Sequence, residues 1–198
     1  MVKEIYPGNG IYSPNELTVV GNTLYFTAHD GTNGRELWKS DGTSSGTVMV
    51  KDITSGSYSS SFEHLTPVGN TLYFRADDGT HGLELWKSDG TSTGTVMVKD
   101  INNGSGGSGL NNLNHLTVIN STLYFLAYDG TNGFELWKSD GTSTGTVMVK
   151  DINSYSSFPH KLTPVGNTLY FTATDGTNGY ELWKSDGTST GTVMVKDI

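Results

Sequence analysis

Acidic side chains recur at fixed positions in this sequence and could, in pairs, perform acid–base chemistry. Glu36 and Asp41 lie in an octapeptide, Glu-Leu-Trp-Lys-Ser-Asp-Gly-Thr, that occurs four times. Two carboxylates can act as general acid and general base, as in glycoside hydrolysis, but the two then need different environments. Four equivalent copies do not supply that asymmetry. We therefore expect these carboxylates, together with Lys39 and Asp52, to cap turns and to form surface ion pairs.

Two further patterns could bind a metal ion. The loop Asp30–Gly34 offers hard oxygen ligands, with Glu36 two residues beyond it, but it is shorter than an EF-hand loop and poorer in carboxylates. A plain hairpin turn is the favoured interpretation over a calcium site. His64, His115 and His160 precede the first strand of three units and could converge on a metal, although their offsets from that strand differ. We predict no metal site and no cofactor.

The tryptophan of the octapeptide could stack on a sugar ring. It stands next to alternating apolar residues, however, so packing between neighbouring sheets is the favoured role. The aspartate can accept N–H bonds from the backbone two residues on, as an Asx turn. We expect both residue types to be structural in every unit. The residues concerned are Trp38, Trp86, Trp137 and Trp183, and Asp41, Asp89, Asp140 and Asp186.

The spacing of the octapeptide reveals an internal repeat. Its tryptophans lie 48, 51 and 46 residues apart, yet four units of 37 residues align without gaps and only the linkers differ in length. We expect one domain over residues 1–198. The segment Val2–Ile5 matches the end of every unit and reads as a partial repeat. The units are residues 17–53, 65–101, 116–152 and 162–198.

Each unit is predicted to form four short strands. They are β-branched and aromatic runs bounded by Gly, Asn and Asp. Gly21-Asn22 is predicted to be a two-residue hairpin loop, and no segment has the 3.6-residue period of a helix. In the first unit the predicted strands are Leu17–Val20, Thr23–Ala28, Glu36–Ser40 and Thr47–Ile53.

Large apolar side chains alternate to both faces of the predicted sheets. Leu37 and Trp38 are adjacent and must point to opposite sides, and Tyr25 opposes Phe26 in the same way. A sheet with one solvated face would carry apolar residues on one side only. Repeated four-stranded sheets covered on both faces are the blades of a β-propeller. The predicted fold is therefore all-β, a propeller of four four-stranded antiparallel blades without helices.

The repeat resembles the ELWxxDGT-repeat family of bacterial proteins through Glu36, Leu37, Trp38, Asp41–Thr43 and their equivalents, in all four units. The resemblance implies a propeller-like protein that is secreted or at the cell surface, and it implies no settled activity. The Asp-Gly hairpin is also similar to the aspartate box of sialidase-like propellers, where it is a structural turn. The chain departs from the family in having only four units, and we expect no signal peptide in it.

Composition excludes several function classes. The net charge is −8 and no basic cluster is present, so neither nucleic acid nor an anionic membrane surface is an expected partner. The sequence has no cysteine, which excludes disulfides and thiolate metal sites. No apolar run approaches the roughly 18 residues of a membrane span.

The variable end of each unit is where we expect a ligand. In an antiparallel meander, the loop between the second and third strands shares one end of the sheet with the linkers, and only this end varies between units. Loops on a rigid scaffold are where binding residues concentrate. His29 and His81 lie at this loop, and the simpler interpretation is that both are solvated turn residues. The predicted ligand-binding residues are His29, Arg35, Asp77, Leu83, Tyr128, Phe134, Thr174 and Tyr180.

Three functions follow from these patterns. The first, which we predict, is a non-enzymatic binding or adhesion module for a carbohydrate or protein ligand. The second is a structural scaffold, engineered or recently amplified, without a ligand. The third is a sialidase-like or glycosidase-like hydrolase, which needs an asymmetric catalytic cluster that we do not find. Val2–Ile5 and Val195–Ile198 are equivalent segments, and in a closed ring both would occupy the strand position that joins the first and last blades. The protein is therefore either a closed four-bladed monomer or a homodimer with a larger ring.

Overall fold

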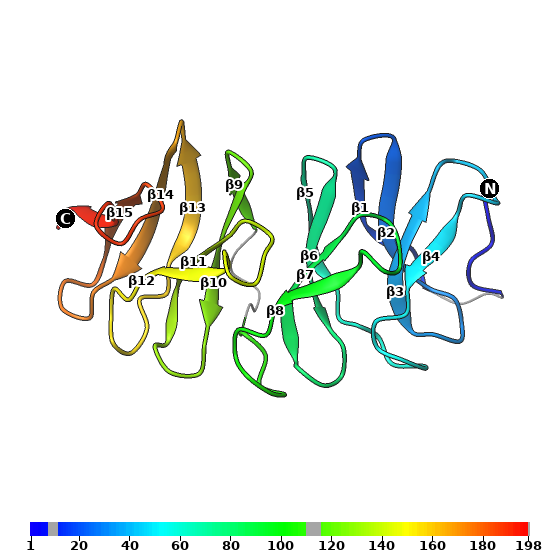
Figure 1. The fold of residues 1–198 in the computed structure, drawn as a ribbon, viewed down its shortest axis with the longest axis horizontal. Coiled ribbons are helices and arrows are strands. Elements are labelled where there is room, and N and C mark those ends of the chain that lie inside the picture. Colours follow the sequence, from blue (N-terminus) through cyan, green and yellow to red (C-terminus); the bar gives the residue numbers. More distant parts are fainter. Residues whose placement is uncertain (8–11, 110–115, 198) are drawn as a thin grey trace. The chain divides into compact units, whose positions relative to one another are not determined.

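The protein consists of short β-strands joined by turns. The computed structural model describes residues 1–7, 12–109 and 116–197, so that His115, one of the candidate metal ligands, lies outside them. The described residues form sixteen strands and no helix (Figure 1). Accordingly, they contain no helix with the length and apolar character needed to cross a membrane.

The strands form four sheets, each with four antiparallel strands in sequential order. This confirms the predicted all-β fold with one sheet, or blade, for each repeat. The chain also divides into two compact units, Met1–Met97 and Val98–Ile198. The strands are β1 Asn15–Val20, β2 Thr23–His29, β3 Arg35–Ser40, β4 Val48–Lys51, β5 Glu63–Val68, β6 Thr71–Asp77, β7 Leu83–Ser88, β8 Val96–Lys99, β9 Thr117–Ile119, β10 Thr122–Tyr128, β11 Phe134–Ser139, β12 Val147–Lys150, β13 His160–Val165, β14 Thr168–Thr174, β15 Tyr180–Ser185 and β16 Val193–Lys196.

The predicted two-residue hairpins are present. Val20 pairs with Thr23 across Gly21-Asn22, and Gly21 has a φ of 59°. In the third unit Asn120 and Ser121 have φ angles of 47° and 66°, so that both lie in the left-handed region, as a type I′ turn requires. Asn tolerates this region better than most residues with a side chain, which explains the exchange of Gly for Asn between units.

Two β-bulges shift strand boundaries away from the predicted ones. The first strand begins at Asn15 and not at Leu17, with a bulge at Glu16, whose φ is 55°. The fourth strand ends at Lys51 and not at Ile53, and a bulge interrupts its pairing with β3. A bulge changes the strict alternation of sides. The second bulge lets the adjacent Val50 and Lys51 both face the next sheet.

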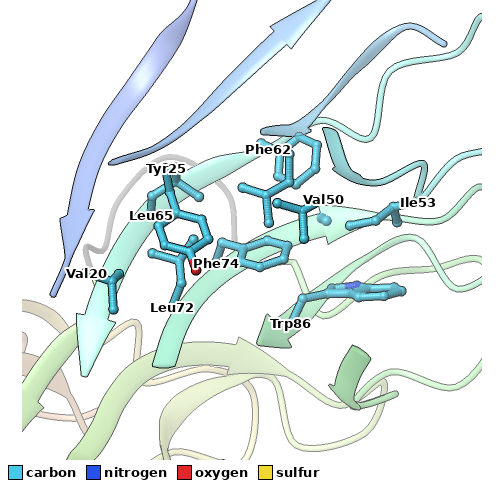
Figure 2. Close-up of a cluster of buried hydrophobic side chains, with 11 residues drawn as sticks. Val20, Tyr25, Val50, Ile53, Phe62, Leu65, Leu72, Phe74 and Trp86 are labelled. Carbon is cyan, nitrogen blue, oxygen red and sulfur yellow. The ribbon is translucent and has the colours of Figure 1, made fainter. Parts of the chain in front are cut away.

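The first and second sheets, which make up the compact unit Met1–Met97, pack through two complementary faces (Figure 2). We name the side of a sheet that carries Tyr25, Leu37 and Val50, or their equivalents, the Leu face. The opposite side, with Phe26, Trp38 and their equivalents, is the Trp face. The Leu face of the first sheet is buried against the Trp face of the second sheet, including Leu72, Phe74, Ala76 and Trp86.

The third and fourth sheets, in the compact unit Val98–Ile198, repeat this packing with the same residue types. Tyr124, Leu136 and Val149 form the Leu face of the third sheet, and they are buried in one cluster with the Trp face of the fourth. That Trp face contributes Leu169, Phe171, Ala173 and Trp183. Alternation along the strands therefore places the octapeptide's Leu on one face of its sheet and its Trp on the opposite face, which agrees with the predicted sidedness.

Lysine side chains also join neighbouring sheets. Lys39 Nζ donates a hydrogen bond to the carbonyl oxygen of Gly90 at 2.7 Å, and Lys51 Nζ donates one to the carbonyl oxygen of Thr95 at 2.8 Å. The ammonium group of Lys51 also lies 6.0 Å from the centre of the Trp86 ring, within cation–π range. The expectation of a surface ion pair for Lys39 is therefore wrong, because its partner is a carbonyl group.

Replacing Trp86 with Ala should test the interface between the first two sheets. The ring is buried, so its loss leaves a cavity and should lower the free energy of unfolding by about 3–5 kcal/mol. Urea denaturation followed by circular dichroism measures this change. Tyr58→Ala is the control, because Tyr58 is exposed and its loss should cost under about 0.5 kcal/mol. Similar costs for the two variants would contradict the packing role.

Candidate functional site

The eight predicted ligand-binding residues come together in pairs. Each pair flanks the loop between the second and third strands of one sheet, and its members are direct cross-strand neighbours. We call this end of a sheet, with that loop and the adjoining linker residues, the linker end. The four pairs belong to four different sheets. They are His29 with Arg35, Asp77 with Leu83, Tyr128 with Phe134, and Thr174 with Tyr180.

In the first sheet, His29 belongs to an aromatic cluster. Its ring stacks on Tyr12 with centroids 4.7 Å apart and meets the edge of Tyr6 at 5.7 Å. Its Nδ1 atom accepts a hydrogen bond from the N–H of Gly31 at 2.8 Å. The expectation of a merely solvated turn residue is therefore wrong for His29. A hollow of about 270 Å³ adjoins the cluster, and its lining includes Tyr6, Tyr12, Pro14 and His29.

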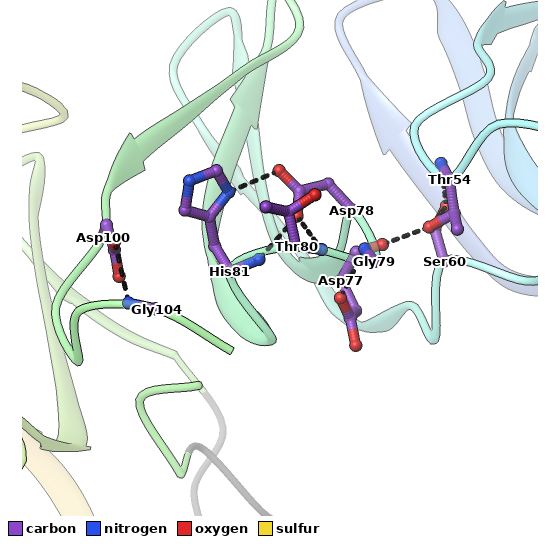
Figure 3. Close-up of polar contacts among 9 residues, drawn as sticks. All are labelled: Thr54, Ser60, Asp77, Asp78, Gly79, Thr80, His81, Asp100 and Gly104. Atoms are coloured by element: carbon purple, nitrogen blue, oxygen red, sulfur yellow. Dashed lines mark hydrogen bonds and ion pairs between the residues drawn. The ribbon is translucent and has the colours of Figure 1, made fainter. Parts of the chain in front are cut away.

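The linker end of the second sheet is polar (Figure 3). Asp77 accepts a hydrogen bond from the N–H of Gly79 at 2.7 Å. His81 Nδ1 lies 2.8 Å from a carboxylate oxygen of Asp78, so His81 is also held in place by a partner. A hollow of about 310 Å³ opens here. It is lined by Thr54, Tyr58, Ser59, Asp77 and Gly79.

Aromatic rings dominate the linker ends of the third and fourth sheets. The Phe134 ring lies 5.4 Å from that of Tyr128 and 5.5 Å from that of Phe158, which comes from the following linker. In the fourth sheet, His160 meets the Tyr180 ring edge-on at 5.2 Å. Edge and offset contacts at these separations are the favoured geometries of aromatic pairs. The predicted pairs are thus extended by linker residues.

In the loop Asp30–Gly34, the carboxylate that could bind a metal ion accepts hydrogen bonds from other residues of the same loop. Asp30 Oδ1 accepts hydrogen bonds from the N–H groups of Thr32 and Asn33, both at 2.8 Å, and Oδ2 accepts one from the Asn33 side chain. Burial tends to raise the pKa of Asp30, but these hydrogen bonds outweigh it and lower the pKa. This is the geometry of a plain hairpin turn. No group of three or more His, Cys, Asp or Glu that could hold a metal exists among the described residues.

The Asx turn predicted at Asp41 is present. Asp41 Oδ1 accepts hydrogen bonds from the N–H of Thr43 at 2.9 Å and from its hydroxyl at 2.7 Å. These bonds stabilise the carboxylate and lower its pKa. Asp89, Asp140 and Asp186 make the same pair of bonds in the other units. This turn lies at the opposite end of the sheet from the linker end.

Glu36 differs from the expectation of a surface group. Its side chain is fully buried, and its two oxygens accept hydrogen bonds from the Ile53 N–H at 2.9 Å and from the Ser60 hydroxyl at 2.6 Å. Burial raises the pKa of Glu36 to about 7, against the opposing effect of these hydrogen bonds. The prediction of a surface ion pair is wrong here, because the linker folds back over the carboxylate.

The linker serine that meets this carboxylate was missed by sequence reasoning. Ser60 also donates its N–H to the carbonyl of Arg35 and accepts a bond at its own carbonyl from the N–H of Asp77 (Figure 3 shows Ser60 and Asp77). Ser157 holds Glu135 in the same way, and burial raises the pKa of Glu135 to about 7. Linker lengths differ, so no fixed spacing marks these serines. A buried serine in each linker is the shared feature.

Glu36→Gln should remove part of the pH dependence of stability. The pKa of Glu36 is about 7 in the folded protein and 4.5 as an ordinary side chain, so the folded state binds the proton more tightly. The free energy of unfolding should therefore fall as the pH rises from 4.5 to 7, on the order of 3 kcal/mol for this group. Gln cannot ionise, so the variant should show a shallower fall.

Denaturation midpoints at pH 5 and pH 8 measure this difference, with the pH values chosen to bracket the folded pKa of about 7. Glu4→Gln is the matched control, because Glu4 is exposed and its replacement should leave the pH slope as in the wild type. An unchanged slope in Glu36→Gln would contradict the assignment of the proton to Glu36.

Comparison with known proteins gives the fold without a family. No protein-family profile and no curated protein matches the sequence. Among solved structures, a mutant puromycin hydrolase complexed with PGG is 16% identical with a TM-score of 0.55, over 93% of this chain and 29% of that chain. A puromycin-hydrolyzing peptidase of Mycobacterium tuberculosis is 13% identical with a TM-score of 0.55, over 98% of this chain and 30% of that one.

A computationally designed protein, Ika8, is also similar. It is 17% identical with a TM-score of 0.50, over 100% of this chain and 52% of that chain. The protein therefore spans less than a third of the peptidase chains and about half of the designed one. At these identities the likeness shows the fold alone, and that fold is the β-propeller.

Proposed function

We propose that the protein is a non-enzymatic binding module that holds its ligand at the linker ends of its sheets. One observation carries this proposal. All the exposed aromatic side chains among residues 1–7, 12–109 and 116–197 lie at linker ends, and none lies at the opposite ends with the Asx turns. Tyr and Phe give a large contact area at a small cost in side-chain entropy. The exposed aromatic residues are Tyr12, Tyr58, Tyr155, Phe158 and Tyr180.

A carbohydrate is the ligand class that suits this surface best. The hollow at the second sheet is lined by the aromatic residue Tyr58 together with the polar residues Thr54, Ser59 and Asp77. An apolar ring beside a few directed polar groups is the usual composition of a small-ligand site. Sugars offer both a C–H face for the ring and hydroxyls for the polar groups. Comparable sites on several sheets would add avidity for a polymeric glycan.

The hydrolase alternative finds less support. Glu36 has the raised pKa that a general acid needs, but burial is its cause and the side chain has no exposed surface. The four octapeptide tryptophans are buried, so their faces are not open to a sugar. The scaffold alternative rests on the octapeptide itself, whose residues are used in packing and turns in every unit. It predicts no ligand at all.

An array of neutral and acidic oligosaccharides tests the proposal, followed by calorimetric titration with a saccharide that binds. Tyr58→Ala, Tyr155→Ala and a double replacement of Tyr128 and Phe134 by Ala should each weaken binding by about tenfold, or about 1.4 kcal/mol. The first two residues are highly exposed, so these variants should fold normally.

Val147→Ala is the matched control, because Val147 is also exposed but lies on β12 outside the linkers. Its affinity should equal that of the wild type. Absence of binding on the array would favour the scaffold. Unchanged affinity in all three aromatic variants would place the ligand elsewhere and refute the linker-end site.

A further inference from the structure

Two apolar faces are incompletely covered, and each is the complement of the other. The first is the Leu face of the fourth sheet. Val195 there is 46% exposed, whereas the equivalent Val50 is 6% exposed in its interface. The second is the margin of the Trp face of the first sheet. Phe26 and Trp38 are buried there with Ile5 packed against them, but Leu17 is 63% exposed, whereas the equivalent Leu65 is 8% exposed. Exposed apolar patches of this kind mark interaction sites.

We propose that the Leu face of the fourth sheet binds the Trp face of the first sheet in a second copy of the chain. The interior of each unit already contains this contact, made by the same residue types. Tyr124, Leu136 and Val149 bury the Trp face of the fourth sheet, and the exposed Leu face offers Tyr170, Leu182 and Val195 in the equivalent positions. A second copy supplies the required Trp face with Phe26 and Trp38.

Glycine in the Asx turn shows where a partner fits. A Cβ atom added at Gly90 would lie 2.2 Å from the Tyr25 hydroxyl, and one at Gly187 would lie 2.4 Å from the Tyr124 hydroxyl. The tyrosine of the preceding sheet therefore packs directly on this glycine. At Gly42 an added Cβ would meet nothing within 4 Å. This place is open to Tyr170 of a second copy.

Charge follows the same pattern. Lys138 Nζ donates a hydrogen bond to the Gly187 carbonyl at 2.8 Å. Hydrogen bonds from Thr188 hold the pKa of the neighbouring Asp186 low, and the charge of Lys138 lowers it further. Lys184, the equivalent of Lys138 on the exposed face, has no hydrogen-bond acceptor in the described part of the chain. The Gly42 carbonyl and Asp41 of a second copy provide the matching acceptor and charge.

The segment Val2–Ile5 covers part of the Trp face of the first sheet. Lys3 Nζ donates to the Thr47 carbonyl at 2.7 Å, as Lys51 does to Thr95 in the interface of the first two sheets. Ile5 packs on the Trp face of the first sheet. The cover is incomplete, because a hollow of about 200 Å³ remains between the segment and Leu17, Leu24 and Phe26. In the proposed contact, β16 of the second copy replaces Val2–Ile5, and its Lys196 takes the bond of Lys3.

Because two different faces meet, the contact is heterologous and joins copies head to tail. Two single variants test this directly. Leu17→Asp damages only the first-sheet face and Val195→Asp only the fourth-sheet face. Both side chains are exposed, so the fold should tolerate the change. Sedimentation equilibrium of the 198-residue chain should show a mass above the monomer that rises with concentration.

Each variant alone should associate at least about tenfold more weakly. An equal mixture should regain a one-to-one complex, because one intact contact remains between the two kinds of copy. Tyr155→Asp, at an exposed linker residue, is the control and should associate like the wild type. A wild-type protein that stays monomeric at every concentration, as it would if the faces met within one chain, overturns the proposal. Variants that associate normally, or a mixture that does not recover, overturn it as well.

Ile5→Asp tests the replacement of the N-terminal segment. It weakens the packing of Val2–Ile5 on the Trp face and should therefore lower the dissociation constant of self-association severalfold. Weaker or unchanged association would show that the segment is not displaced. Saccharide binding at the linker ends involves other residues, so its success or failure is independent of these results.

Discussion

The burial of a Leu face against a Trp face is the interaction on which the rest of the structure depends. Each sheet is apolar on both sides, so no sheet can satisfy itself and every one needs a neighbour. The octapeptide supplies one residue to each side: Leu37 faces the second sheet, and Trp38 lies on the opposite face of the first sheet. The Lys39 bond to the Gly90 carbonyl and the fit of Tyr25 on Gly90 then fix the register of one sheet on the next.

The linkers are anchored to this scaffold around a buried carboxylate, and they differ in length and sequence between repeats. Glu36 and Glu135 are buried carboxylates that hold a linker serine, Ser60 or Ser157, through short hydrogen bonds. A buried carboxylate is costly unless its lone pairs are satisfied, so this position demands a partner in every unit. Exposed linker residues such as Tyr58 and Tyr155 carry no such demand. The linkers differ in length and sequence between repeats, while the sheet packing is the same in both compact units.

This difference between repeat residues and linker residues explains where the proposed binding residues lie. Conspicuous residues of the repeat are used in packing and turns, while the varied residues gather at the linker ends. Aromatic side chains such as Tyr58 and Tyr155 stay exposed there, beside loops whose backbone is fixed by Asx-type hydrogen bonds. Rigid loops that present exposed aromatic rings lose little entropy on binding a ligand. The propeller fold itself, shared with peptidases at low identity, does not specify a ligand.

The sequence by itself determined the repeat, the strands, the hairpins and the two faces of each sheet. These features follow from local periodicity and turn chemistry, which a single chain displays without reference to distant residues. Only the tertiary structure decided that Glu36 is buried, that Ser60 meets it, and that His29 stacks on Tyr12. It also decided the bulge that turns Val50 and Lys51 to the same side. The linker contacts join residues whose separation varies, 24 residues from Glu36 to Ser60 but 22 from Glu135 to Ser157, so no fixed spacing in the sequence encodes them.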